Sequence, residues 1–380
     1  MRLARDSRAW SLWALVPVLA WAASAAGVVI YDPVTPRRNT IDPGDASGWH
    51  LQGLFRMHLG TPIGPEHFIT AGHISNQTLG SNIVFNSGPN AGRYRTLAVF
   101  DDPNTDLRVW QIDGTFNQFA PLYLKGDEVA KPLTVFGRGR APGAEVIGPE
   151  SRPNRTELKG WQWGLDDKVL SWGRNTISGV TSTQSAEHVL LFEFNAIAGA
   201  DEAGLSGRDS GGGVFIQDIG GRWKLAGINL GSPGPFQLDQ NGTPTGDPFN
   251  ATLFDMGGLH LVGSDPPCCV PDRRNDVAAA AAATRISSNL DWIGTIVPQA
   301  VPEPGTLALL VAGIGLASRR RAGLAVAPTL NCHAAATSCG RSFARRVDSS
   351  PYARLLHIRR QGAVDRCRRH AGPCLAAIVE

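Results

Sequence analysis

Three polar residues in this chain together have the chemistry that acyl transfer requires. His73 ends a strand-like run, Asp106 begins another, and Ser210 lies in the glycine-rich stretch 204–213. A serine hydroxyl is a weak nucleophile, so it needs a neutral imidazole within hydrogen-bond reach to accept its proton. The imidazole needs a carboxylate on its other nitrogen, which sets the tautomer and stabilises the imidazolium. Glycines beside the serine allow backbone N–H groups to converge on the developing oxyanion.

Each of these residues also has a simpler interpretation. A histidine after a strand is more often structural or exposed, Asp106 alone fits a turn, and the run Asp209–Gly213 fits a tight β-turn. The order His, Asp, Ser on a predicted β body favours the catalytic interpretation of the three together.

The elements that would position these residues are short strands. Between residues 27 and 270, apolar runs rich in β-branched and aromatic residues alternate with clusters of Gly, Pro, Asn and Asp, which predicts a barrel or a sandwich. Residues 284–297 predict a helix, because their apolar residues fall on one stripe (Ile286, Leu290, Ile293 and Val297). Residues 268–283 predict a loop with an alanine tract, in which Cys268 and Cys269 are free thiols.

The motifs around the three residues resemble those of the chymotrypsin/trypsin-like serine proteases. Thr70–His73 (TAGH) is similar to the family's T-A-A-H segment, Asp106-Leu107 to its D-[IL]-A-L segment, and Asp209–Gly213 (DSGGG) to its G-D-S-G-G-P segment. The resemblance spans roughly residues 50–297. It implies an all-β fold of two six-stranded β-barrels with a short C-terminal helix. It also implies an endopeptidase that acts on proteins or peptides through an acyl-enzyme, without a cofactor or a metal.

Position by position, the resemblance implies a role for each residue. His73 is expected to be the general base, Asp106 to orient it, and Ser210 to be the nucleophile. The backbone N–H groups of Arg208 and Ser210 are expected to form the oxyanion hole. The strand that contains Leu225–Ile228 is expected to pair with the substrate backbone.

Two positions depart from the family pattern. Arg208 stands where the family usually has a glycine, and a β-carbon there could tilt the peptide away from the oxyanion. Losing that donor would cost roughly 3–4 kcal/mol of transition-state stabilisation. Alternatively, Arg208 reorganises the loop or pairs with Asp209 or Asp201. In the specificity pocket, Gly204 stands where trypsin-type enzymes have an aspartate. The substrate side chain bound there is therefore expected to be apolar or small, instead of Lys or Arg.

The two ends of the chain carry segments of a different kind. Residues 1–26 combine basic residues, an apolar stretch and small residues, which predicts a signal peptide. No activation motif of the Arg-Ile-Val-Gly-Gly type follows it, so no zymogen switch of the mammalian kind is expected. The predicted protease domain, 27–297, is followed by a sorting segment, 298–321.

The sorting segment contains Pro-Glu-Pro, an apolar run and three arginines, and residues 302–321 resemble the PEP-CTERM sorting tail of exported bacterial proteins. The apolar run, 306–318, is short for a membrane span. The resemblance implies recognition by an exosortase, membrane contact through 306–321 and delivery to the cell surface. Residues 322–380 form a tail rich in Arg and Cys, which is expected to be an unstructured extension; a nucleic-acid arm or a metal-binding segment is the alternative.

The net charge of +3 hides an uneven distribution. Residues 1–26 carry +2 and residues 301–380 carry +8, which leaves −7 on residues 27–300. The basic pI therefore belongs to the ends, and no nucleic-acid partner is expected for the body. No cysteine precedes Cys268, so the body does not depend on disulfides or thiolate metal sites.

The sequence thus predicts an exported serine endopeptidase that is sorted to the bacterial cell envelope. The alternative is a binding protein on the same fold, a pseudoprotease that Arg208 has disabled.

Overall fold

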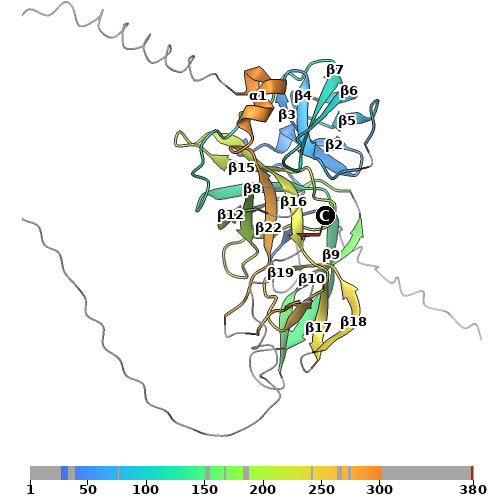
Figure 1. Cartoon of the computed structure of the whole chain (residues 1–380), viewed down its shortest axis with the longest axis vertical. Coiled ribbons are helices and arrows are strands. Elements are labelled where there is room, and N and C mark those ends of the chain that lie inside the picture. Colours follow the sequence, from blue (N-terminus) through green and yellow to red (C-terminus); the bar gives the residue numbers. More distant parts are fainter. Residues whose placement is uncertain are drawn as a thin grey trace, which may run out of the picture.

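The computed structural model of the chain describes residues 27–301, apart from 33–38, 76, 150–154, 167, 183–187, 241–242, 263–267 and 273–274, together with residues 378–379. Within these residues strands predominate and the one α-helix is short, so the predicted all-β class is confirmed (Figure 1). The predicted signal peptide and residues 302–321 of the sorting segment lie outside the described residues.

Six strands of the N-terminal half close into a barrel, in the order β2-β3-β4-β7-β6-β5. Aromatic rings fill part of its interior, where the ring centroid of Phe55 lies 5.0 Å from that of Phe68 and 5.3 Å from that of Trp110. Such edge-to-face packing stabilises a barrel beyond the burial of area alone. The barrel and the 3-10 helix before it comprise η1 (Trp49–Leu51), β2 (Gly53–Phe55), β3 (His58–Gly64), β4 (His67–Ala71), β5 (Asn82–Phe85), β6 (Gly92–Asp101) and β7 (Leu107–Asp113).

A second sheet contains the strand that follows Ser210. Its order is β11-β8-β15-β16-β22-β13-β12, and the two-residue strands β1 and β14 pair with each other. The sequence resemblance implied a second six-stranded barrel. This sheet has eight strands, seven along this path and β23 beside β16, and within the described residues its end strands β11 and β12 do not pair. The bounds are β1 (Val29–Ile30), β8 (Pro132–Gly137), β11 (Ser171–Thr176), β12 (Gly179–Thr181), β13 (Val189–Glu193), β14 (Ala203–Gly204), β15 (Gly213–Gln217), β16 (Trp223–Pro233) and β22 (Ala280–Arg285).

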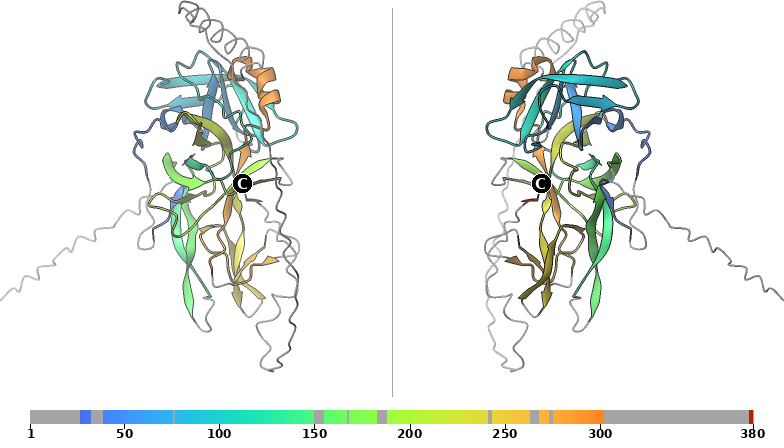
Figure 2. Two further views of the ribbon diagram at one scale, coloured as in Figure 1. Left: turned by 90° about the vertical axis from the view of Figure 1, so that its left-hand side faces the viewer. Right: turned by 90° about the vertical axis from the view of Figure 1, so that its right-hand side faces the viewer.

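Two smaller sheets extend from the second sheet, at the end of the molecule away from the barrel (Figures 1 and 2). One has the order β19-β10-β9 and the other the order β18-β17-β20-β21. Their bounds are β9 (Arg140–Pro149), β10 (Thr156–Asp166), β17 (Phe236–Gln240), β18 (Thr243–Phe249), β19 (Ala251–Leu253), β20 (Leu259–Leu261) and β21 (Cys268–Cys269).

A buried lysine joins these smaller sheets. Lys159 on β10 is fully buried, and its Nζ donates to Glu157 at 2.6 Å and to Asp255. Although burial favours the neutral amine, the hydrogen bonds to Asp255 and Glu157 raise the pKa of Lys159. The lysine therefore remains charged and balances the carboxylates around it.

The alanine tract is a strand, and the expectation of a loop there is wrong. β22 lies between β13 and β16, with Leu191 opposite Ala282 and Ile228 opposite Thr284. The helix α1 (Leu290–Ile296) is therefore shorter than predicted and is followed by the 3-10 helix η2 (Pro298–Ala300). Alanine favours helices when isolated, but here small side chains allow the strand to be buried between two neighbours.

Of the predicted tail, the structure describes only β23 (Ile378–Val379), which pairs antiparallel with Ser232 and Pro233 of β16. Among the described residues, no helix has the length and apolar character needed to cross a membrane.

Candidate active site

His73 and Asp106 meet because two paired strands of the barrel end next to each other. β4 and β7 pair with Ala71 opposite Leu107, so the residues just beyond these ends are neighbours. The Asp106 Oδ2 lies 2.7 Å from the His73 Nδ1, and the Asp106 Oδ1 accepts the backbone N–H of His73 at 2.7 Å. Both side chains are largely buried. The carboxylate thus holds the ring and the backbone of the same histidine.

Ser210 reaches the same end of the barrel because a glycine follows it. Gly211 has a φ of +81°, and a β-carbon there would overlap with the Thr70 Oγ1 on β4 and the Leu59 carbonyl on β3. Only glycine therefore allows the Ser210 loop to pack this closely against the strand that leads to His73. The loop is also held by Asn229, whose carbonyl accepts the Gly211 N–H at 3.1 Å.

Arg208 has a left-handed backbone conformation, with a φ of +75°. Among the described residues, the backbone N–H groups of Arg208 and Ser210 donate no hydrogen bond. The Arg208 Nη1 lies 3.2 Å from the Asp166 Oδ2 on β10, so its partner is neither Asp209 nor Asp201.

We expect Arg208→Gly to change the rate at which an organophosphorus probe reacts with Ser210 by less than about threefold. A left-handed backbone at an arginine lowers the free energy of unfolding by roughly 1–2 kcal/mol, and a partly exposed ion pair raises it by about 0–1 kcal/mol. The variant should therefore be equally stable or slightly more stable to urea. Asp166→Asn removes the ion pair and keeps the β-carbon, so it is the matched control. A gain of 100-fold or more in Arg208→Gly would mean that the arginine blocks the oxyanion hole.

Asp209 is completely buried beneath this loop. One carboxylate oxygen accepts the Gly139 N–H at 2.8 Å, and the other accepts the Ser206 N–H at 2.8 Å. Burial raises the pKa of Asp209 to about 7, although these hydrogen bonds lower it. Gly27, the first described residue, lies against the carboxylate, since a β-carbon on Gly27 would be 2.8 Å from the Asp209 Oδ1.

His58 is a residue of this site that the sequence did not single out. It begins β3, and its ring lies next to the backbone of Ser210. Burial, followed by the charges of His73 and Arg208, lowers the pKa of His58 to about 4, so the ring is neutral at physiological pH. The position of His58 in the sequence does not indicate that it belongs to the site. The pairing of β2 with β3 and the fold of the Ser210 loop bring it next to Ser210.

Gly204, the expected specificity residue, lies in β14 and is buried. A β-carbon there would be 2.5 Å from the Thr252 Cγ2 and 3.1 Å from the nearest atom of Phe194. Any larger residue would therefore need Thr252 and Phe194 to move. The part that Gly204 plays in specificity stays a prediction.

Two groups of described residues have metal-ligand types but are already satisfied. Asp239, His260 and Cys269 lie together, but Cys269 is disulfide-bonded, which corrects the expectation of a free thiol. A disulfide sulfur is not the thiolate that binds metals. The second group consists of the carboxylates of Glu157, Asp255 and Asp272, and the ammonium of Lys159 lies among them.

Comparisons with known proteins add two findings. Residues 300–321 match the model of the PEP-CTERM protein-sorting motif, which indicates an exported bacterial protein that is sorted to the cell surface. The chain is similar in structure to neuropsin, a serine protease expressed in the limbic system of mouse brain. The similarity has 12% identity and a TM-score of 0.41, and it covers 68% of this chain and 98% of neuropsin. No curated protein sequence matches the chain.

Proposed function

We propose that the protein is an exported serine endopeptidase in which Ser210 is the nucleophile, His73 the general base and Asp106 the residue that orients the base. The observation that supports this most is the doubly hydrogen-bonded Asp106, which contacts the Nδ1 and the backbone N–H of His73 at 2.7 Å each. A carboxylate at Nδ1 leaves Nε2 as the basic nitrogen, which is the tautomer that proton abstraction from a serine requires.

In this mechanism the Ser210 hydroxyl attacks the peptide carbonyl while the His73 Nε2 accepts its proton. The Asp106 carboxylate stabilises the imidazolium, and the backbone N–H groups of Arg208 and Ser210 donate to the oxyanion. His73 then gives the proton to the leaving amine, which departs and leaves an acyl-enzyme on Ser210. Water, deprotonated by His73, attacks the ester and regenerates the hydroxyl.

The left-handed φ of Arg208 supports the oxyanion hole, because arginine adopts the positive φ that the family's glycine is expected to supply at this position. The same observation weakens the alternative of a binding protein that Arg208 has disabled. The sorting motif at 300–321 supports an exosortase as the processing partner and contact with the membrane during sorting.

Labelling with a fluorescent fluorophosphonate tests the proposed function, because this probe phosphonylates an activated serine and needs no knowledge of the substrate. We expect one label per protein molecule, and no label on Ser210→Ala. Ser288→Ala, which removes an exposed hydroxyl near α1, should label like the parent. Folded protein that does not react would contradict the proposal and favour the binding-protein alternative.

A further inference from the structure

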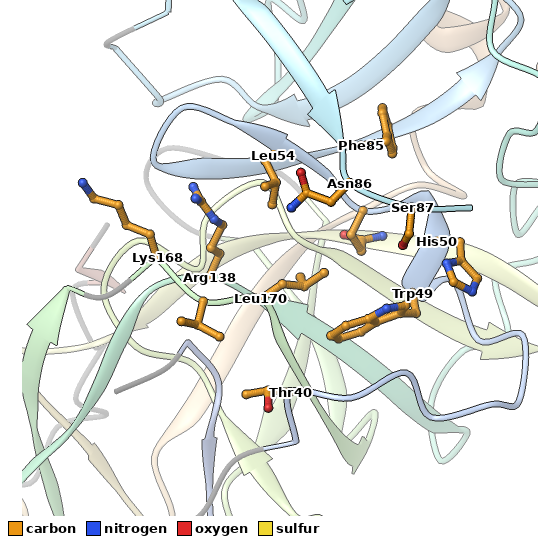
Figure 3. Close-up of a pocket in the computed structure, with 12 residues that line it drawn as sticks. Thr40, Trp49, His50, Leu54, Phe85, Asn86, Ser87, Arg138, Lys168 and Leu170 are labelled. Atoms are coloured by element: carbon orange, nitrogen blue, oxygen red, sulfur yellow. The ribbon is translucent and has the colours of Figure 1, made fainter. Parts of the chain in front are cut away.

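A pocket of about 350 Å³ lies between the barrel and the strands of the second half of the chain (Figure 3). The barrel side contributes Trp49, Leu54 and Asn86, and the other side contributes Arg138 and Lys168. The pocket is separate from the His73–Asp106 pair but close to the nucleophile loop. Gln52, which also lines it, accepts the N–H of Gly213, three residues after Ser210, at 3.1 Å.

The charges that line this pocket are positive. Arg138 and Lys168 line it without any carboxylate among the lining residues, although residues 27–300 have a net charge of −7. His50, which also lines it, is paired with Asp42 at 2.7 Å. A cationic pocket on an acidic body will attract an anionic group of a ligand.

Arg138 has hydrogen-bonding capacity to spare. Its Nη1 donates to the Arg56 carbonyl, but its Nε is buried and has no hydrogen-bond partner among the described residues. Asp166 is the nearby carboxylate, and it is already paired with Arg208. The residue as a whole is half-buried, so the accessible part of its guanidinium can pair with a ligand carboxylate in the pocket.

Lys168 is held beside the pocket by an unusual backbone conformation. Its φ is +63°, which is rare for a residue with a side chain, and among the described residues its ammonium has no ion-pair partner. Lys168 is exposed, so its ammonium is accessible to a ligand. Figure 3 shows Lys168 and Arg138 on the same side of the pocket, with Trp49 and Leu170 along its floor.

We propose that this pocket binds an acidic side chain of the polypeptide substrate, at a position removed from the scissile bond. The two cations would take the carboxylate, the Asn86 amide would donate to it, and the apolar atoms of Trp49 and Leu54 would cover its aliphatic stem. The proposal rests on the proposed function for the polypeptide nature of the ligand, but its binding step does not require an active nucleophile.

Binding is measured on the Ser210→Ala protein by fluorescence polarisation. The probe is a fluorescein-labelled ten-residue Ala/Leu peptide that contains two Glu, and the comparison peptide has Gln at both positions. We expect the Glu peptide to bind at least fivefold more tightly, and we expect Lys168→Gln or Arg138→Gln to remove that preference. Arg222→Gln is the matched control, because Arg222 is an exposed cation outside the pocket whose loss changes the net charge equally.

Equal binding of the two peptides would overturn the proposal, and so would an equal loss in Arg222→Gln and Lys168→Gln, which would indicate a general charge effect. Lys168→Glu provides a second variant if Arg138→Gln does not fold. It should weaken the binding of the Glu peptide and leave the binding of the Gln peptide unchanged. If the fluorophosphonate test fails while the Glu preference holds, the pocket stands as a peptide-binding site and the hydrolytic function alone is rejected.

Discussion

Replacing Asp106 by asparagine should slow the reaction of Ser210 with a fluorophosphonate by on the order of 10⁴-fold at neutral pH. The two hydrogen bonds of Asp106 set the direction of this effect. One carboxylate oxygen accepts the His73 backbone N–H, so the single oxygen of an asparagine would take that place. The asparagine NH₂ would then face Nδ1 and donate to it, which leaves the proton on Nε2. A protonated Nε2 cannot accept the proton of Ser210.

The measurement is the second-order rate constant for labelling between pH 6 and 10. Asp101→Asn is the control, because Asp101 is an exposed aspartate near the site that pairs with Arg108. Both variants lose one negative charge, so only the tautomer effect distinguishes them. A loss of less than tenfold in Asp106→Asn would mean that the pair does not orient the base.

Although the sequence has no activation motif of the Arg-Ile-Val-Gly-Gly type, the position of Gly27 points to a switch at this residue. A protein that begins at Gly27 should react with the fluorophosphonate at least about 100-fold faster than one that retains Ala25 and Ala26. Gly27 lies against the Asp209 carboxylate, which is buried and, in the continuous chain, has no cation among its hydrogen-bond partners. Cleavage after Ala26 would convert the backbone amide of Gly27 into an ammonium at this carboxylate. A buried charge is stabilised strongly by a partner of opposite sign, and Asp209 is part of the loop that carries Arg208 and Ser210.

The pH dependence of stability separates the two forms. In the continuous chain the pKa of Asp209 is about 7 when folded and near 3.8 when unfolded. The folded state therefore binds the proton more tightly, and this contribution to the unfolding free energy is full below pH 4 and is lost as the pH rises towards 7. An ammonium at Gly27 would favour the charged carboxylate and lower the pKa of Asp209 relative to the continuous chain, so less of the unfolding free energy would be lost as the pH rises towards 7.

Urea unfolding midpoints between pH 4 and 8 measure this difference. Burial also raises the pKa of Glu202 to about 7, but Glu202 affects both forms equally and cancels in the comparison. Asp209→Asn should abolish the difference between the two forms. Equal pH profiles and equal labelling rates for the two forms would show that the amino group of Gly27 does not pair with Asp209.

Sequence alone determined the strand-rich class, and it supplied the three residues of the candidate triad as a prediction. Strands such as β4 and β7 are short runs of apolar and β-branched residues, and this signal is local, so it is visible without knowledge of the neighbours. His73 and Asp106 could be chosen because they occur with Ser210 in the order His, Asp, Ser, within motifs that resemble those of a known family. Their contact at 2.7 Å follows from the pairing of those two strands.

Only the tertiary structure decided what depends on distant neighbours. The alanine tract became β22 because burial between β13 and β16 outweighs the helical preference of alanine, which is a weak local term. Arg208 keeps a left-handed φ and takes Asp166, 42 positions earlier in the sequence, as its partner. Two further features depend on the tertiary structure in the same way: the position of His58 at the site, and the cationic pocket between the barrel and the second half of the chain. In both, strand pairing brings together residues whose separation in the sequence does not predict a contact.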